Sequence, residues 1–231
     1  MYKFTTILWD VDGTLLDFLY SQRYAITKCF QSIGRDITEE MIQRYSQIND
    51  RFWKQLELGE ITKEELLTGR FLCLFEEYGI ENVDVESFRL EYQEALGSTF
   101  SYIDDSLEVC KTLYGKVKQY VVTNGVTSTQ LNKLKLSGLD EWMEELFISE
   151  QIGAPKPQKE FFDYCFSQIE EKDKSKILLV GDSLTSDIKG GVLAGIATCW
   201  YRMEGSKNYT SFHPDYEISD LHQILDILQS V

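Results

Sequence analysis

The sequence predicts an α/β fold in which a parallel sheet carries a large helical insertion. Two patterns support this prediction. Short apolar runs alternate with helical segments after residue 100, whereas residues 18–100 show helical periodicity and no strand-like run. Alternating strands and helices imply parallel strands joined by crossover helices, because a tight turn cannot connect parallel neighbours.

The expected sheet contains five apolar runs of strand length. The first spans residues 6–10 and leads into the turn sequence Asp-Val-Asp-Gly-Thr at 10–14. The others span 120–123, 146–149, 177–181 and 196–201. Helical segments such as 127–137 and 161–169 separate the later runs. Because the first run would otherwise be isolated, we place it in the same sheet. The expected domains are therefore an α/β core of residues 1–17 and 101–231, and a helical unit of residues 18–100.

Two local signals define helices inside the insertion. Thr62 and Glu65 match a capping box, in which the hydroxyl and the carboxylate each accept a bond from a free backbone N–H, and Gly79 is suited to end that helix. Another helix is indicated by apolar residues that recur on one face: Met41, Tyr45, Ile48 and Phe52.

Composition excludes several classes of function. The 231 residues include 38 Asp and Glu against 23 Lys and Arg, a net charge of −15, and no basic stretch, which argues against nucleic-acid binding. No run of 18 apolar residues indicates a membrane span, and the N-terminal apolar run is too short for a signal peptide. The five cysteines form no CxxC pair and suggest neither disulfides nor zinc. We expect a cytoplasmic protein, either a monomer or a homodimer.

Polar residues follow three of the expected strands. Asp10 and Asp12 end the first, Thr123 and Asn124 end the second, and Asp182 follows 177–181, with Asp187 five residues later. Ligands of open α/β sheets bind at the carboxyl ends of the strands, so these groups should converge. Clustered carboxylates repel one another unless a cation lies between them, which indicates Mg²⁺. Each motif alone is also compatible with an ordinary turn or helix cap.

Lys156 stands between Pro155 and Pro157, whose restricted backbone would hold its ammonium group in a fixed direction. A loop lysine is usually solvated, and the expected acidic cluster is what favours a catalytic role here.

The four motifs together resemble those of the haloacid dehalogenase-like (HAD) superfamily. They are DVDGT at 10–14, VVTNG at 121–125, APKP at 154–157 and GDSLTSD at 181–187, in the order usual for that superfamily. The resemblance covers the whole chain. It implies a Rossmann-like parallel sheet core with an inserted all-helical cap domain that selects the substrate.

The resemblance also implies a mechanism, namely phosphoryl transfer through an aspartyl phosphate with Mg²⁺ as cofactor. Asp10 would be the nucleophile, and Asp12 would protonate the leaving group and then activate water. Thr123, the Asn124 amide and Lys156 would bind the phosphoryl oxygens. The metal ligands would be Asp182, Asp10 and the Asp12 carbonyl, with Asp187 acting through water or by orienting Lys156. An Asp at position 12 favours a phosphatase over a dehalogenase, because only the former needs acid–base catalysis there.

A finer resemblance connects the chain to the pyrimidine 5′-nucleotidase branch. It rests on Asp17-Phe18, Asn49 with Trp53, and the segments 56–71, 125–138 and 147–164. The substrate would be a small phosphomonoester, most simply a pyrimidine nucleoside 5′-monophosphate. Aromatic residues that could stack on a base are Phe18, Tyr20, Tyr24 and Trp53. Arg51 and Arg70 could contact a ribose or a base carbonyl, but we expect both on solvated helix faces.

Three other interpretations remain open on the sequence alone. A signalling receiver domain also combines Asp, Thr and Lys with Mg²⁺, but it is much shorter and its phosphorylated Asp lies on another strand. A catalytically silent HAD-fold binding protein is a second possibility, although the complete motif set argues against it. A sugar-phosphate or phosphoglycolate phosphatase would share every catalytic residue.

Overall fold

The computed structural model describes residues 2–203, 205 and 207–229. These residues form a six-stranded, fully parallel sheet with the order β3-β2-β1-β4-β5-β6. β1 is central and buried along its whole length, as expected for a parallel strand covered on both faces. The strands are β1 (Thr6–Trp9), β2 (Lys118–Thr123), β3 (Glu145–Ile148), β4 (Ile177–Gly181), β5 (Ala197–Tyr201) and β6 (Tyr216–Ile218).

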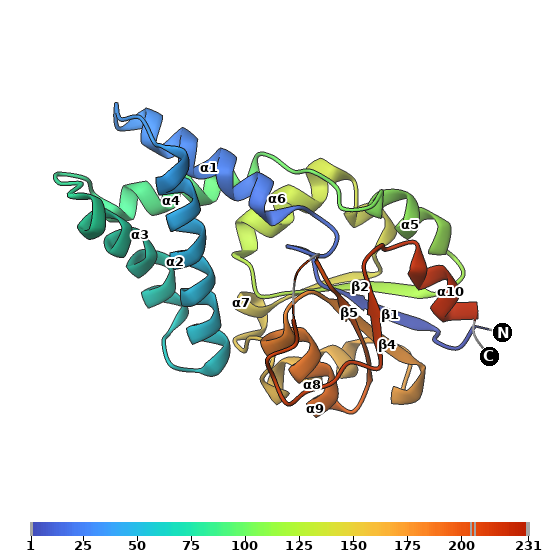
Figure 1. The fold of residues 1–231 in the computed structure, drawn as a ribbon. Helices are drawn as coiled ribbons and strands as arrows, with labels where there is room; N and C mark the ends of the chain where they lie inside the picture. Colours follow the sequence, from blue (N-terminus) through green and yellow to red (C-terminus); the bar gives the residue numbers. More distant parts are fainter. Residues whose placement is uncertain (1, 204, 206, 230–231) are drawn as a thin grey trace.

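Helices cover both faces of this sheet (Figure 1). On one face, α5, α6 and α10 pack with Ile7, Trp9 and Val121 around a large apolar cluster. On the other face, α8 packs with Leu8 and Val122. The helices of this part are α5 (Ser106–Leu113), α6 (Thr127–Ser137), α7 (Ser149–Ile152), α8 (Lys159–Gln168), α9 (Lys189–Ala194) and α10 (Gln223–Gln229), with short turns at Asp140–Trp142, Lys174–Lys176 and, π-helical, Leu184–Ile188.

Four helices between β1 and α5 form a separate layer beyond the carboxyl end of the sheet, on the side opposite the two termini (Figure 1). They share an apolar cluster of their own, in which Phe71 contacts the rings of Tyr45, Phe88 and Tyr92. They are α1 (Phe18–Ser32), α2 (Glu39–Leu58), α3 (Lys63–Tyr78) and α4 (Val85–Gly97). The capping box of Thr62 and Glu65 is present at the start of α3, and Gly79 ends that helix in the left-handed conformation.

The α/β fold with inserted helices is confirmed, and every expected strand is present within one or two residues of its expected limits. The strand β6 was missed, because Tyr216–Ile218 is too short to show an alternating pattern. The domain limits at 17/18 and 100/101 stay predictions. All five cysteines are free, as expected. Among the described residues, none of the helices combines the length and hydropathy that crossing a bilayer requires.

Candidate active site

The register of the sheet brings the predicted site residues to one edge. Trp9 of β1 is aligned with Val121 of β2 on one side and with Val180 of β4 on the other. Asp10 therefore emerges between the ends of β2 and β4, and Asp182 lies one residue beyond β4. The expected convergence of the motifs at the carboxyl edge is what the structure shows.

Lys156 lies at the centre of this edge and is fully buried. Its ammonium group donates to Asp10 Oδ1 at 2.7 Å, to Asp187 Oδ1 at 2.6 Å and to the carbonyl of Val122 at 2.8 Å. The Asn124 side chain fixes the lysine backbone, because its amide accepts from Lys156 N at 2.8 Å and donates to Lys156 O at 2.9 Å. All three ammonium protons are thus donated to protein oxygens. The contact with Asp187 is compatible with its expected role of orienting Lys156, which stays a prediction.

Three carboxylates crowd around this one cation. Oxygens of Asp10, Asp182 and Asp187 all lie within 4.8 Å of one another. Burial raises the pKa of Asp10 to about 7, although the nearby Lys156 opposes the shift, and it raises the pKa of Asp182 and Asp187 as well. No donor among the described residues contacts the Asp182 carboxylate, which is only partly buried. Ionised, the three acids exceed Lys156 by two negative charges, and oxygen ligands with that excess fit Mg²⁺.

Gly13 allows the first motif to pass close to this cluster. Its φ is +90°, a conformation that side-chain-bearing residues rarely adopt, and a Cβ there would lie 2.5 Å from Asp182 Oδ2. Asp10 and Asp12 can therefore point in different directions from the tip of one strand.

The Asp12 carboxylate turns away from the three acids and toward α6. It accepts a hydrogen bond from Gln130 Nε2 at 2.6 Å and forms an ion pair with Lys133, which is fully buried. Gly125 makes room for this arrangement, since a Cβ there would lie 2.3 Å from Gln130 Nε2. The Asp12 side chain is thus outside the carboxylate cluster, and metal binding through its backbone carbonyl stays a prediction.

Thr123 is placed to donate a hydrogen bond into the same space. Its hydroxyl oxygen accepts from the backbone N–H of Gly125 at 3.1 Å, which leaves the hydroxyl proton for another acceptor. Thr123 and Asn124 are both buried at the end of β2. Their roles in phosphate binding stay predictions that this placement is compatible with. That of Lys156 also stays a prediction, and its three ammonium protons are donated to protein oxygens here.

A cavity of about 810 Å³ opens above these groups. Its floor is the strand-end wall, which we define as the residues of the four motifs that line it; its roof is the helical wall, formed by α1 and α2. Of the four aromatic residues expected to contact a base, Phe18 and Trp53 line the cavity. Tyr20 and Tyr24 do not. They lie half-exposed on α1, one helical turn apart, so this placement does not support base contact for them, and their role stays a prediction.

A comparison with known families shows which family the chain belongs to. The family model described as "haloacid dehalogenase-like hydrolase" matches residues 4–195 of the chain. The chain belongs to this family. It is 37% identical to the HAD-hydrolase YfnB of Bacillus subtilis over 99% of this chain and 97% of that one. A crystal structure of YfnB bound to magnesium, said to reveal interdomain movement, superposes with a TM-score of 0.94 over 99% and 100% of the two chains at 36% identity.

Two relatives of this HAD-family chain carry a named activity. The pyrimidine 5′-nucleotidase PynA of Streptococcus pneumoniae is 37% identical over 98% of this chain and 95% of its own length. The pyrimidine 5′-nucleotidase YjjG of Escherichia coli is 31% identical over 98% of each. The predicted family and the predicted resemblance to pyrimidine 5′-nucleotidases are thereby confirmed.

Sequence reasoning missed several residues of this HAD-family site. Gln130 and Lys133 lie one helical turn apart on α6 and carried no signal beyond their spacing. Glu57, in the last turn of α2, accepts hydrogen bonds from Ser183 at 3.2 Å and from Thr185. Burial raises the pKa of Glu57, and the two hydroxyls partly offset that effect.

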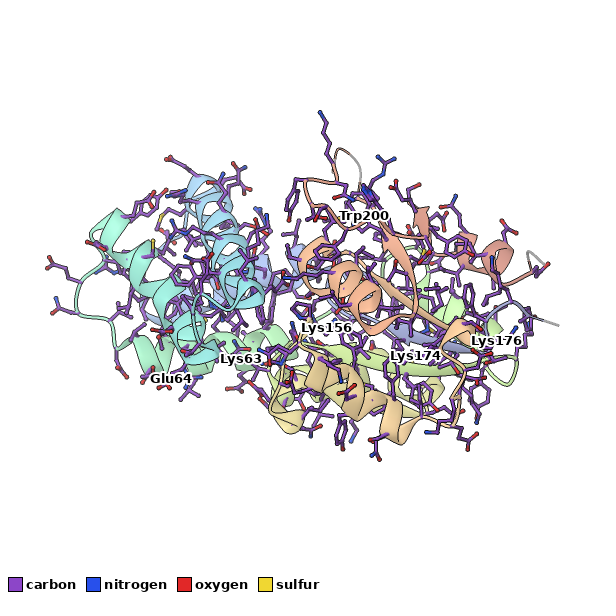
Figure 2. The ribbon with its side chains drawn as sticks, turned by 90° about the horizontal axis from the view of Figure 1, so that it is seen from below. Lys63, Glu64, Lys156, Lys174, Lys176 and Trp200 are labelled. Atoms are coloured by element: carbon purple, nitrogen blue, oxygen red, sulfur yellow. The ribbon has the colours of Figure 1, made fainter. Side chains whose placement is uncertain are left out.

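Lys63 makes a second polar contact between the helical layer and the sheet. At the start of α3, its ammonium group donates to the carbonyls of Asn124 at 2.8 Å and Gly125 at 2.9 Å and pairs with Glu150 at 3.0 Å. Figure 2 shows Lys63 and Lys156 at the boundary between the two parts of the molecule. Lys63 and Glu57 therefore anchor the helical layer to the loops that follow β2 and β4.

Arg70 also differs from expectation. The prediction placed Arg51 and Arg70 on solvated helix faces, and Arg51 is indeed exposed. Arg70 is buried, with its guanidinium group 4.8 Å from the ring centre of Phe71 and 4.9 Å from that of Tyr92. Helical periodicity could not assign its face, because α3 carries apolar residues around most of its circumference.

Proposed function

We propose that this protein is a Mg²⁺-dependent phosphatase that hydrolyses nucleoside 5′-monophosphates, with pyrimidine nucleotides as the preferred substrates, through an aspartyl phosphate at Asp10. The observation that carries the proposal is the separation of two acids that lie two residues apart. Asp10 is held by Lys156 among the clustered carboxylates, whereas Asp12 is held by Gln130 and Lys133 on the other side of the strand tip. This separation supports the proposal that Asp10 is the nucleophile and Asp12 the proton donor and acceptor.

Asp10, Asp182 and Asp187 are the side chains that would hold Mg²⁺, together with the Asp12 carbonyl. When bound, the ion supplies positive charge that neutralises the excess of these carboxylates and lets a phosphate dianion approach them. The magnesium in the YfnB structure supports this assignment.

The first chemical step forms one bond and breaks another at phosphorus. A carboxylate oxygen of Asp10 attacks the phosphorus atom, and the ester oxygen leaves while Asp12 transfers its proton to it. In the second step Asp12, now ionised, accepts a proton from water as the water oxygen attacks the same phosphorus. The products are the nucleoside and inorganic phosphate, and Asp10 is regenerated.

The phosphoryl oxygens need donors throughout both steps. Lys156 supplies a fixed positive charge: burial alone would lower its pKa, but the carboxylates of Asp10 and Asp187 outweigh burial and raise it, so it stays protonated. The Thr123 hydroxyl oxygen accepts from Gly125 N, so its proton is left to donate to a phosphoryl oxygen. The backbone N–H of Asn124, the next residue in the chain, is the third donor of the proposal. Catalysis of phosphoryl transfer depends mainly on such positioning and electrostatics.

The substrate class follows from the cavity and from the relatives. A volume of about 810 Å³ is in the range that holds ligands of nucleotide size. Its helical wall offers Phe18 and Trp53 as flat apolar surfaces, and the relatives PynA and YjjG are pyrimidine 5′-nucleotidases. We assign residues 18–100 as the cap that selects the leaving group.

A substrate panel tests this proposal. Phosphate release is measured with UMP, dUMP, dTMP, CMP, AMP, phosphoglycolate and several sugar phosphates, each with Mg²⁺ and with EDTA. We expect Mg²⁺-dependent turnover that is fastest for pyrimidine nucleotides and absent in Asp10→Asn. Preference for a sugar phosphate or phosphoglycolate would keep the mechanism and overturn the substrate class. Activity that is unaffected by EDTA would overturn the metal assignment.

A further inference from the structure

The helical wall of the cavity contains amide groups whose hydrogen-bonding capacity is not used within the protein. Gln22 of α1 and Asn49 of α2 both line the cavity and are both buried. No partner among the described residues contacts Gln22 Nε2. Asn49 makes one hydrogen bond, in which its Oδ1 accepts from Arg70 Nη1 at 2.6 Å. Buried polar groups without partners are rare, and where they line a cavity a ligand is the natural partner.

Arg70 determines which way the Asn49 amide points. The oxygen and nitrogen of an amide are normally assigned from their hydrogen-bond partners. A guanidinium group has donors only, so the atom that faces it must be the amide oxygen. The Asn49 NH₂ group is therefore fixed on the side away from Arg70 and can offer the cavity only a donor.

Nothing else in the described structure accounts for a charged arginine at this position. Arg70 forms no ion pair with a carboxylate among the described residues, and its Nε and Nη2 have no hydrogen-bond partner. The rings of Phe71 and Tyr92 flank the guanidinium group and compensate part of its desolvation. Its one directed contact is the bond to Asn49, so we treat Arg70 as a positioning residue for that amide.

We propose that Asn49, oriented by Arg70, donates a hydrogen bond to the carbonyl oxygen at position 4 of the base, and so makes the enzyme prefer uracil and thymine nucleotides to cytosine nucleotides. The inference rests on the proposed nucleotidase function. With the phosphate at Asp10, the edge of a pyrimidine farthest from the phosphate faces the helical wall. Uracil and thymine present an acceptor at that edge. Cytosine presents an amino group there, which is a donor, so neither that group nor the Asn49 NH₂ group would find an acceptor.

The decisive variant is Asn49→Asp. The new carboxylate has the shape of the amide and can still accept from Arg70, but it turns the cavity-facing group from a donor into an acceptor. We expect kcat/KM for UMP to fall at least about tenfold, which corresponds to one lost hydrogen bond. The ratio of CMP to UMP activity should rise, while kcat/KM for p-nitrophenyl phosphate, which has no base carbonyl, should stay within about twofold.

Controls separate the possible failures. Asn132→Asp adds the same charge at an exposed position of α6 and should leave all three activities unchanged. If the wild type hydrolyses no phosphomonoester, the proposed function fails. If the wild type is active but Asn49→Asp lowers UMP, CMP and p-nitrophenyl phosphate activities equally, the proposed function survives and the role of Asn49 is refuted.

The role of Arg70 has its own test. In Arg70→Met the amide loses its fixed orientation, so we expect KM for UMP to rise several-fold with kcat for p-nitrophenyl phosphate unchanged. Arg70→Lys retains a donor and should recover part of the lost UMP affinity. Equal losses for both substrates in a variant whose Tm is unchanged would show that Arg70 does not act through the base.

Discussion

The two walls of the cavity differ in how their polar groups are satisfied. On the strand-end wall every proton of Lys156 is bound to an oxygen, and carboxylates surround it. On the helical wall the amides of Gln22 and Asn49 and the rings of Phe18 and Trp53 lie beside the charged Asp50, Lys54 and Glu57, and the Gln22 amide nitrogen has no partner among the described residues. Arg70 of α3, which contacts this wall through Asn49, also keeps donors without partners there. The first wall carries fixed charges that suit one phosphate group. The second carries weaker, unpaired groups that a variable leaving group can complete.

The difference indicates which changes abolish the reaction and which only redirect it. Electrostatic groups on the strand-end wall act on atoms that are common to all phosphomonoesters, so their loss affects every substrate. Amides on the helical wall act on one part of one substrate, so their loss changes a ratio of activities.

The largest expected effect is that of Asp10→Asn. Removal of the nucleophile should lower kcat by about 10⁴-fold or more for every substrate, since replacing a nucleophile commonly has an effect of that size. Steady-state assays with UMP and p-nitrophenyl phosphate measure this loss, and circular dichroism checks the fold. Residual activity that differed between the two substrates would place Asp10 among specificity residues instead.

Asp182→Asn tests the metal assignment through stability. Burial raises the pKa of Asp182 well above its ordinary value of 3.8. A carboxyl group of this kind contributes less to stability as the pH rises from its ordinary pKa toward its folded pKa. Removal of the Asp182 carboxylate should therefore stabilise the metal-free protein by about 1–3 kcal/mol at pH 8 and by less at pH 5.

Thermal unfolding with and without Mg²⁺ measures both parts of that prediction. Mg²⁺ should raise the Tm of the wild type and leave that of Asp182→Asn unchanged. Asp226→Asn removes an exposed carboxylate of α10 and should respond to Mg²⁺ like the wild type. Equal Mg²⁺ responses in all three proteins would contradict a metal site at the strand ends.

Lys133→Met tests whether Asp12 is held for proton transfer. A displaced Asp12 protonates a poor leaving group less well, so kcat/KM for UMP should fall by roughly 10- to 100-fold, part of the effect typical of a general acid. p-Nitrophenyl phosphate needs no proton for departure and should lose much less. Lys133→Arg should restore part of the UMP activity, and Lys135→Met, on the exposed face of α6, should have no effect. An equal loss with both substrates would assign Lys133 to structure alone.

The smallest effect is expected for Lys63→Met. This variant removes the contacts of α3 with Asn124, Gly125 and Glu150. The helical wall would be held less firmly, so KM should rise about three- to tenfold for nucleotides with little change in kcat. Lys116→Met, at an exposed turn, is the matched control. A large fall in kcat would instead connect Lys63 to the chemistry of the strand-end wall.

The strand-end wall could be predicted from the sequence because its information is local. Each motif directly follows an apolar run, and a parallel sheet brings the ends of such runs together whatever their separation along the chain. Asp10 and Asp182 lie 172 positions apart in the sequence, yet the register of β1 and β4 places them side by side. Periodicity and turn residues were sufficient for that inference.

The helical wall could not be predicted in the same way. Its residues are spread over α1 and α2, and which of them face the cavity depends on how these helices pack with each other and with α3. Tyr20 and Tyr24 attracted attention because they are aromatic, whereas Gln22, between them, lines the cavity together with Phe18 and Leu19 of the same helix. Arg70 was expected in solvent because an unpaired buried arginine is rare, and only the tertiary packing shows that it faces Asn49.

The measurement that tests the central claim most directly is detection of the phosphorylated enzyme. Asp12→Asn is mixed with p-nitrophenyl phosphate and Mg²⁺, quenched in acid and digested, and the peptides are identified by mass spectrometry. The leaving group departs without a proton donor, but water is no longer activated, so we expect the phosphoryl group to accumulate on Asp10. Modification of another residue, or release of p-nitrophenol with no modified peptide, would contradict the division of roles between Asp10 and Asp12.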